Sequence, residues 1–205
     1  MVPPRHCTGA LLAGGRSVRF GGSPKGLETV GGERIVDRAR AALVEASDAL
    51  LLVANDGNAA AWLPGVKVAR DVRAGAGALS GLHAALSAAP GDVLVLAWDA
   101  PFVPAALLRA LRDAGELSDA DAAVPRSSSP WGFEPLCAWY APACVPAIER
   151  HLEASDHRAG GWQHHVRTLH VDVSGWGDPA VLFLNVNTRE DLMRAERLFA
   201  QRDVP

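Results

Sequence analysis

The sequence predicts an α/β fold in which helices connect the strands of a mostly parallel sheet. Short apolar runs alternate with amphipathic stretches from one end of the chain to the other. The 205 residues, 49% of them hydrophobic, suffice for one core that buries roughly 70% of the unfolded surface. No repeat and no linker interrupts the pattern, so we expect one domain over residues 1–205.

The alternation is clearest in the first half of the chain. We expect strands at residues 8–12, 49–54, 66–69 and 93–97, and helices at residues 33–46 and 79–88. The run at 93–97 is the most strand-like, whereas the helix at 33–46 carries its apolar side chains on one stripe. Gly14 and Gly15 follow the first strand, and we expect the chain to turn there because glycine lets the backbone turn sharply.

The second half alternates less regularly. We expect helices at residues 105–114 and 143–154, and strands at residues 122–124, 135–140, 168–173 and 182–184. The serine run at 127–129 predicts a mobile loop. A last helix follows Thr188, which forms a capping-box pattern with Asp191 and precedes an apolar face made by Leu192, Ala195, Leu198 and Phe199.

Composition excludes several classes of protein. The 20 basic and 23 acidic residues give a net charge of −3, which offers no basic field for nucleic acid. No apolar run approaches the length of a membrane span and the N-terminus lacks a secretion signal, so we expect a cytoplasmic protein. Cys7, Cys137 and Cys144 match no zinc or disulfide spacing, and we expect them to be reduced.

Polar residues at the carboxyl ends of the expected strands are the first candidates for a site, because open α/β sheets bind ligands at that edge. These residues are Gly14 with Gly15, Asn55, Asp71 and Asp99, and Asn185 and Asn187 also follow an expected strand. Any single Asp or Asn at such a position more often caps a turn than binds a ligand. Together they favour one shared pocket.

A glycine-rich stretch, LLAGGRSVRFGGSPK at residues 11–25, is more specific than any single residue. A glycine-rich turn that leaves a strand presents backbone N–H groups to an anion, and Arg19 and Lys25 add positive charge. These features suit a nucleoside triphosphate. The stretch matches neither the Walker A pattern nor the Gly-x-Gly-x-x-Gly fingerprint.

The same stretch resembles the signature of the MobA-like NTP transferases, Leu-Ala-Gly-Gly-x-Ser-x-Arg with a lysine after a short gap. Later motifs resemble the family in order and spacing over nearly the whole chain, at residues 77–83, 98–102, 134–137 and 185–192. The resemblance implies a Rossmann-like three-layer α/β/α sandwich of the nucleotide-diphospho-sugar transferase type. It also implies nucleotide contacts at Leu12, Ala13, Gly14, Gly15, Lys25, Asn55, Asp71, Gly81 and Asp99.

The resemblance also implies a reaction, the transfer of GMP from GTP to the terminal phosphate of molybdopterin with release of pyrophosphate. Gly15 and Gly81 favour guanine within the family. Positioning and charge neutralisation dominate such a transfer, so Arg19, Lys25 and Asp99 are the expected catalytic residues. Mg²⁺ is the expected cofactor, with Asp99 as its ligand and Asn187 or Asn185 as a second one.

The resemblance places the nucleotide and metal in the N-terminal half of the chain and the acceptor in the C-terminal half. It implies GTP and molybdopterin as substrates, and transient contacts with molybdoenzyme apoproteins or with other proteins of cofactor biosynthesis. Nucleic acid and membranes are not expected as partners.

Two alternatives stay open. Pro24 stands where guanylyl-transferring members usually carry Asp, and Ala78 and Ser80 also depart from the guanine-associated pattern. A cytidylyl or sugar-phosphate nucleotidyltransferase of the same fold is therefore the rival enzyme. A non-catalytic nucleotide-binding subunit is the rival from another class, although it would have less need of Arg19, Lys25 and Asp99 together.

Histidine and tryptophan residues near residue 160 have two interpretations. His157, His164 and His165 lack a metal-ligand spacing, and adjacent residues on a strand would point to opposite faces, so structural or surface roles are favoured. The segment that contains Trp162 is also a candidate to line a pterin site, because a flat heterocycle stacks on an indole.

Overall fold

The computed structural model describes residues 6–14, 24–71 and 77–202, and it is built around a seven-stranded sheet with the order β5-β4-β1-β6-β8-β7-β9. Its strands are β1 (Cys7–Ala13), β4 (Ala49–Ala54), β5 (Lys67–Ala69), β6 (Asp92–Ala97), β7 (Ala122–Pro125), β8 (Cys137–Tyr140) and β9 (Thr168–Val171). Only β8 runs antiparallel to its neighbours in this sheet, and the other pairs are parallel. The predicted mostly parallel sheet is therefore confirmed.

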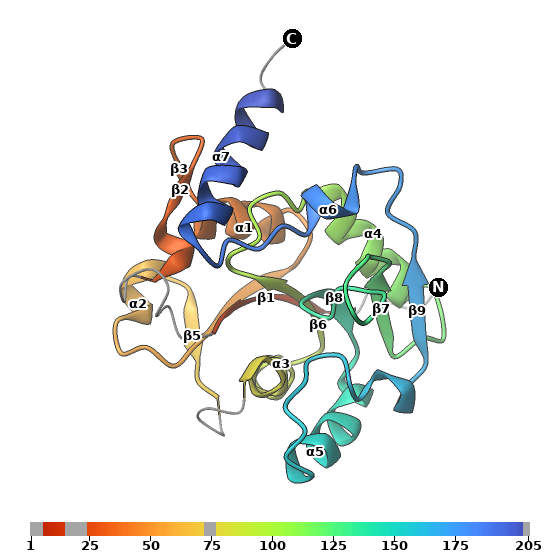
Figure 1. Ribbon diagram of the computed structural model, residues 1–205. Coiled ribbons are helices and arrows are strands. Elements are labelled where there is room, and N and C mark those ends of the chain that lie inside the picture. The colour runs from red at the N-terminus through yellow and green to blue at the C-terminus, as the bar shows by residue number, and fades with distance from the viewer. Residues whose placement is uncertain (1–5, 15–23, 72–76, 203–205) are drawn as a thin grey trace.

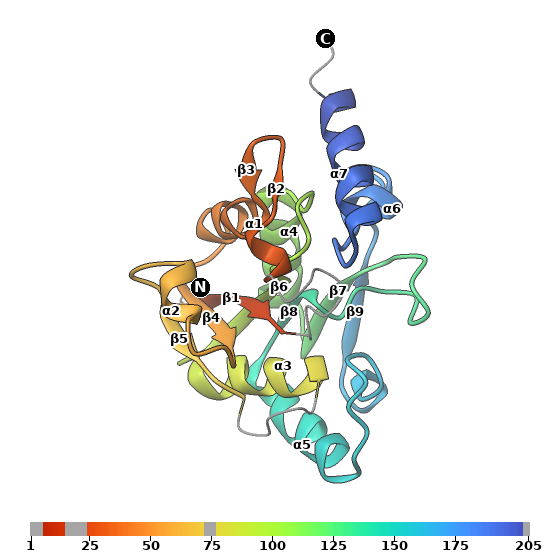
Figure 2. The same cartoon turned by 60° about the vertical axis from the view of Figure 1, so that its left-hand side comes forward.

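Helices cover both faces of this sheet. The helices α1 (Ile35–Val44) and α4 (Ala105–Glu116) lie on one face, and α3 (Gly77–Ala88) and α5 (Val145–Glu153) lie on the other (Figures 1 and 2). Successive residues of a strand point to opposite faces. Leu11 of β1 therefore packs in the core under α1, whereas its neighbour Leu12 packs in the core under α3. Burial on both faces explains why these strands are continuously apolar.

A smaller apolar cluster holds the C-terminal helix α7 (Arg189–Arg202) against a hairpin of β2 (Thr29–Val30) and β3 (Glu33–Arg34) (Figure 2). Val30, Ile35 and Ala195 are completely buried in this cluster. The predicted capping box at the start of α7 is confirmed. Asp191 N donates to Thr188 Oγ1 (3.1 Å), and Thr188 N donates to Asp191 Oδ2 (2.8 Å).

Short helical turns complete the described elements. They are η2 (Lys25–Leu27), α2 (Ala59–Trp62), η3 (Pro142–Cys144), η4 (Gln163–His165) and α6 (Pro179–Leu182).

The predicted strand at 182–184 is wrong, because Leu182 ends the helix α6. Asp178 starts this helix, since its Oδ1 accepts from Ala180 N (2.9 Å) while Pro179 occupies the first turn. This cap and proline outweigh the apolar run that follows them. Asn185 and Asn187 consequently follow a helix, not a strand.

The three cysteines are free and buried. Burial raises the pKa of the Cys7 and Cys144 thiols to about 12, and it raises that of Cys137 as well. Each thiol is therefore protonated and unreactive near neutral pH. Within the described ranges, no helix has both the length and the apolar character that a bilayer crossing requires.

Candidate nucleotide-binding site

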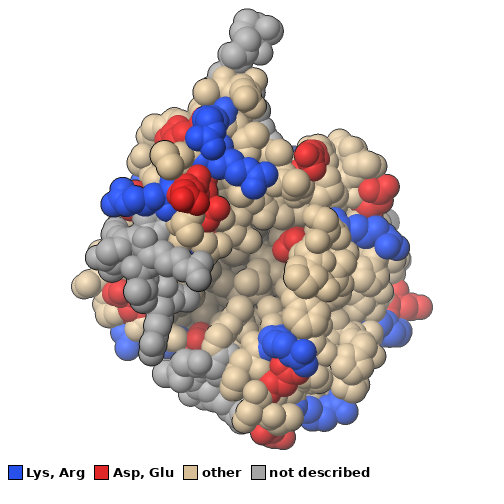
Figure 3. Space-filling model, in the orientation of Figure 1, with Lys and Arg blue, Asp and Glu red and all other residues tan. Residues whose placement is uncertain are grey.

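A pocket of about 310 Å³ lies at the carboxyl edge of the parallel strands. Strand ends supply its walls, because β1, β4, β5 and β6 finish side by side at this edge. The structure brings ten of the predicted site residues into its lining: Leu12, Ala13, Gly14, Lys25, Asn55, Asp71, Gly81, Asp99, Asn185 and Asn187. In the space-filling view of Figure 3, one face of the molecule is hollowed at its centre.

Two predicted residues, Gly15 and Arg19, lie outside the described part of the chain. The preceding residue, Gly14, is exposed, and a Cβ built on it would meet no atom within 4 Å. Open space therefore lies next to the backbone at the start of the glycine-rich turn.

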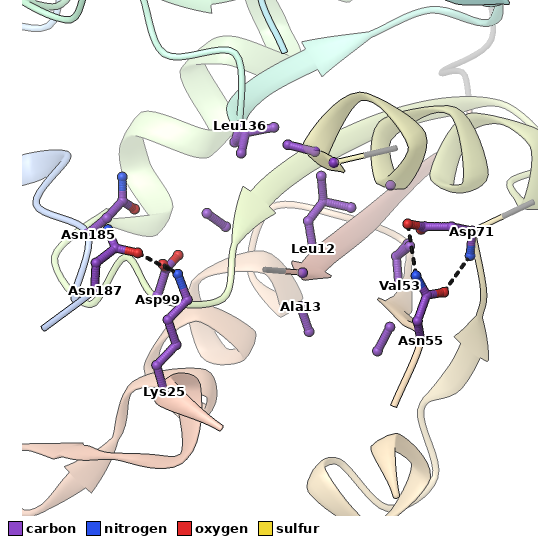
Figure 4. Close-up of a pocket in the computed structure, with 16 residues that line it drawn as sticks. Leu12, Ala13, Lys25, Val53, Asn55, Asp71, Asp99, Leu136, Asn185 and Asn187 are labelled. Atoms are coloured by element: carbon purple, nitrogen blue, oxygen red, sulfur yellow. Dashed lines mark hydrogen bonds and ion pairs between the residues drawn. The ribbon is translucent and has the colours of Figure 1, made fainter. Parts of the chain in front are cut away.

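One end of the pocket is charged. Lys25 Nζ forms an ion pair with Asp99 and also donates to Asn187 Oδ1 (2.7 Å). Asp99 is buried, with 7% of its side chain exposed, and the Lys25 side chain is 13% exposed. Figure 4 shows these groups converging from separate segments, with Asn185 beside them. The ammonium group of Lys25 thus contacts both Asp99 and Asn187, which were predicted as metal ligands.

Close packing positions this ion pair. Gly26, which follows Lys25, lies against the indole of Trp98, and a Cβ on Gly26 would overlap that ring. Trp98 also stacks on Trp62, with ring centroids 4.9 Å apart. Gly26 directly follows Lys25, and Trp98 directly precedes Asp99. The contact between Gly26 and the Trp98 indole therefore sets the separation of Lys25 and Asp99.

The backbone of Asp99 connects this end to the C-terminal half of the chain. Val186 N donates to Asp99 O (2.9 Å), so the segment that carries Asn185 and Asn187 is held beside the end of β6. This contact lies next to Asn187, which is 162 positions from Lys25 in the sequence and accepts the hydrogen bond from Lys25 Nζ.

The other end of the pocket is a reciprocal pair between Asn55 and Asp71. Asn55 Nδ2 donates to Asp71 Oδ2 (3.0 Å), and Asp71 N donates to Asn55 Oδ1 (2.9 Å). Burial raises the pKa of the Asp71 carboxyl, and the bond from Asn55 opposes that rise. In Figure 4, Leu12 and Ala13 lie between this pair and the charged end.

The start of α3 borders the amide and carboxylate end. Gly77 has φ +69°, which favours glycine, and a Cβ on Gly81 would lie 3.8 Å from Asp71 Oδ1. The pocket also contains Val53, Ala54, Ala97 and Leu136, which we did not predict. Their signal was position: each stands within two residues of an end of a predicted strand that faces this edge.

Asp99 and the asparagine amides offer oxygen atoms, which suit a hard divalent cation. Among the described residues, no group of three or more His, Cys, Asp or Glu side chains could hold a metal ion. A divalent cation here would therefore also need oxygen atoms from a molecule bound in the pocket. The arrangement can hold an anion chain at the charged end and a hydrogen-bonding group at the other end.

The structure bears on both interpretations of the segment near residue 160. Trp162 is completely buried and its Nε1 donates to Ala159 O (2.8 Å), so it offers no face for stacking. His164 and His165 lie on the turn η4, not on a strand, and their ring centroids are 3.8 Å apart. A helical turn brings consecutive side chains closer than a strand would.

Comparisons with known proteins identify similar chains. The family model "MobA-like NTP transferase domain" matches residues 9–169. A protein of Pelotomaculum thermopropionicum named "Probable molybdenum cofactor guanylyltransferase" is 37% identical over 194 residues, which cover 93% of this chain and 92% of that protein. Further curated relatives with 30–34% identity are named molybdenum cofactor guanylyltransferase.

Two solved structures have a fold similar to that of this chain. The molybdopterin-guanine dinucleotide biosynthesis protein A of Archaeoglobus fulgidus superposes with a TM-score of 0.79 and 26% identity, covering 95% of this chain and 99% of that one. A protein of Mycobacterium tuberculosis in complex with manganese has a TM-score of 0.63 and 26% identity, and covers 94% of this chain and 98% of its own.

Proposed function

Because the chain belongs to the MobA-like NTP transferase family, we propose that it transfers GMP from GTP to the terminal phosphate of molybdopterin and releases pyrophosphate. The observation that carries this proposal is the two-ended pocket. It combines a cation paired with a buried carboxylate at one end with an amide–carboxylate pair at the other. The names of the relatives supply the acceptor and the nucleotide.

The amide and carboxylate end suits guanine. Guanine presents two adjacent donors, N1–H and the 2-amino group, and a carboxylate accepts both. Asp71 would bind this edge, and Asn55 orients the Asp71 carboxylate through the bond that it already makes. Because Gly81 has no side chain, the space beside that carboxylate, where a Cβ would lie 3.8 Å from Asp71 Oδ1, is open to a flat ring.

The charged end suits the triphosphate. Family members use a divalent metal, and here we propose Mg²⁺, held by Asp99 with Asn187 or Asn185 as a further oxygen ligand. When bound, the cation would offset the charge of the phosphate oxygens. Lys25, whose Nζ now contacts Asp99 and Asn187, would then contact the phosphates, and Arg19 would add a second positive charge.

Positioning accounts for the rest of the reaction. An oxygen of the acceptor phosphate attacks the α-phosphorus of GTP, the bond to the β-phosphate bridging oxygen breaks, and pyrophosphate leaves on the opposite side. Lys25 stabilises the negative charge that develops on the leaving group. The acceptor would approach from the side formed by the C-terminal half, where Leu136 and Asn185 border the pocket. The product would pass to another protein by a transient contact.

Pyrophosphate release tests this proposal. Purified protein with GTP and Mg²⁺ should release pyrophosphate only when molybdopterin is added. Faster release with CTP would favour a cytidylyltransferase, and release with a sugar phosphate as acceptor would favour the sugar-phosphate enzyme. Nucleotide binding with no release for any acceptor would contradict an enzyme and leave the binding subunit.

A further inference from the structure

A second cavity adjoins the nucleotide pocket. It has a volume of about 290 Å³ and shares Ala97, Leu136 and Asn185 with the first pocket. Most of its remaining wall comes from residues 129–137, which are part of the connection between β7 and β8 together with the first residue of β8. The sequence offered Trp162 for a heterocycle, but Trp162 is buried elsewhere, and a different tryptophan, Trp131, lines this cavity.

Glu134 supplies a carboxylate to this cavity. Its backbone is fixed on both sides, because Glu134 N donates to Pro125 O (3.2 Å) and Cys137 N donates to Glu134 O (3.2 Å). The Ser127 hydroxyl forms a hydrogen bond with its carboxylate, while burial raises its pKa. The described residues provide no salt bridge to Glu134. A half-buried, oriented carboxylate that forms no salt bridge with the described residues is suited to accept from a neutral donor.

Trp131 is held at the mouth of the same cavity. A Cβ on Gly160 would lie 2.8 Å from Trp131 Cδ2, so the glycine lets the indole pack against the backbone. The Arg158 guanidinium lies 5.8 Å from the centre of the ring. Hydrogen bonds also hold the connection that carries Trp131, since Gly132 N donates to Ser129 O (2.8 Å). Despite these contacts, 36% of Trp131 stays exposed.

We propose that this second cavity binds the pterin of the acceptor, with Glu134 accepting hydrogen bonds from its 2-amino-4-oxopyrimidine edge and Trp131 stacking on its rings. This inference rests on the proposed function. A pterin presents N3–H and a 2-amino group side by side, so one carboxylate can accept from both. Aromatic stacking adds affinity without reading the edge.

The shared wall explains why the two cavities adjoin. With the pterin in the second cavity, the phosphate on its side chain would extend toward Leu136 and Asn185, and from there toward the triphosphate. The protein would then read the same pyrimidine edge twice, guanine with Asp71 and the pterin with Glu134.

Two pteridines test the role of Glu134. Pterin carries the 2-amino group, whereas lumazine carries a carbonyl that repels a carboxylate. Binding is measured by pteridine fluorescence, with saturating GTP and with EDTA, so that the guanine site is filled and no transfer occurs. Wild-type protein should bind pterin at least tenfold more tightly than lumazine. Glu134→Gln should reduce that ratio about tenfold, because its amide can donate to the carbonyl of lumazine.

Trp131 has a different expected signature. Trp131→Ala should weaken pterin and lumazine by the same factor, and Trp131→Phe should restore most of that loss, because a phenyl ring still stacks. Glu153→Gln, at an exposed position on α5, is the matched control and should change neither affinity. The GTP affinity of each variant reports whether the fold and the first pocket are intact.

An unchanged pterin-to-lumazine ratio in Glu134→Gln would overturn this inference. So would loss of pterin binding when GTP is added, because it would place pterin in the guanine site. Either result, with GTP binding and GTP-dependent pyrophosphate release intact, leaves the proposed function standing. Pyrophosphate release that requires CTP or a sugar phosphate would instead overturn the proposed function itself.

Discussion

The two ends of the nucleotide pocket are built differently. At the Asn55–Asp71 end, two hydrogen bonds join residues that are 16 positions apart and follow paired strands. At the Lys25–Asp99 end, an ion pair and an amide join three segments, two of them 162 residues apart. The first end therefore depends on local strand pairing, whereas the second depends on the completed fold.

This difference indicates that the two ends have different functions. A buried charge pair costs free energy to desolvate and is weak evidence for stability, so its presence in a pocket favours a role in charge chemistry. An amide–carboxylate pair with free acceptor capacity instead suits discrimination between bases. Substitutions at the Lys25–Asp99 end should lower kcat. Substitutions at the Asn55–Asp71 end should raise the KM for the nucleotide and lower the selectivity between bases.

The largest effect should follow removal of the charged groups. Lys25→Ala or Asp99→Ala should lower the kcat of pyrophosphate release by roughly 100-fold or more, because each loses transition-state charge stabilisation. Lys67→Ala, which removes the other lysine of the chain from an exposed position on β5, is the control. Wild-type rates in either active-site variant would contradict the proposed roles.

A smaller loss of turnover should follow displacement of Lys25 without its removal. In Gly26→Ala the new methyl group would overlap the Trp98 indole, so we expect kcat to fall about tenfold and the melting temperature to drop. Gly57→Ala adds the same methyl group where no atom lies within 4 Å, and both values should stay near wild type. Equal behaviour of the two variants would refute the positioning argument.

The Asn55–Asp71 end should respond in selectivity. Asp71→Asn should raise the KM for GTP about tenfold, with kcat within about twofold of wild type, because a carboxylate acceptor is replaced by an amide. ITP lacks the 2-amino group, so the preference for GTP over ITP should also shrink. Kinetics with both nucleotides measure this, with the exposed Asp113→Asn as control. A loss confined to kcat would place Asp71 in the chemistry instead.

The smallest effect concerns stability. Burial raises the pKa of Asp71 above its usual 3.8, so the folded chain holds that proton more tightly than the unfolded chain does. The free energy of unfolding therefore decreases as pH rises through the window from 3.8 up to the raised pKa. Asp71→Asn removes this titration. The melting temperature of the variant minus that of wild type, both measured without nucleotide, should therefore increase as pH rises through that window. A difference that does not depend on pH would contradict this.

Sequence patterns predicted the fold well where local signals were strong. The strand at 49–54 and the cap of Thr188 with Asp191 are confirmed. The hairpin of β2 and β3 was missed, because two-residue strands show no periodicity. The strand expected at 182–184 was wrong, because Asp178 and Pro179 start a helix that an apolar run alone does not reveal.

The site shows the same limit. Strand-end position predicted that Asn55, Asp71 and Asp99 would share a pocket, and the structure places them in one. Their roles stay predictions. The contact of Lys25 with Asn187 depends on packing across 162 residues, which spacing cannot predict. Trp131 and Glu134 were not predicted as site residues, because only the folded connection between β7 and β8 turns them toward one cavity.

The dependence of GTP affinity on Mg²⁺ tests the division between the two ends most directly. Titration calorimetry would compare wild type, Asp99→Asn and Asp71→Asn at increasing Mg²⁺. We predict that Mg²⁺ tightens GTP binding by similar factors in wild type and in Asp71→Asn, and has little effect in Asp99→Asn. Full Mg²⁺ enhancement in Asp99→Asn would contradict the account.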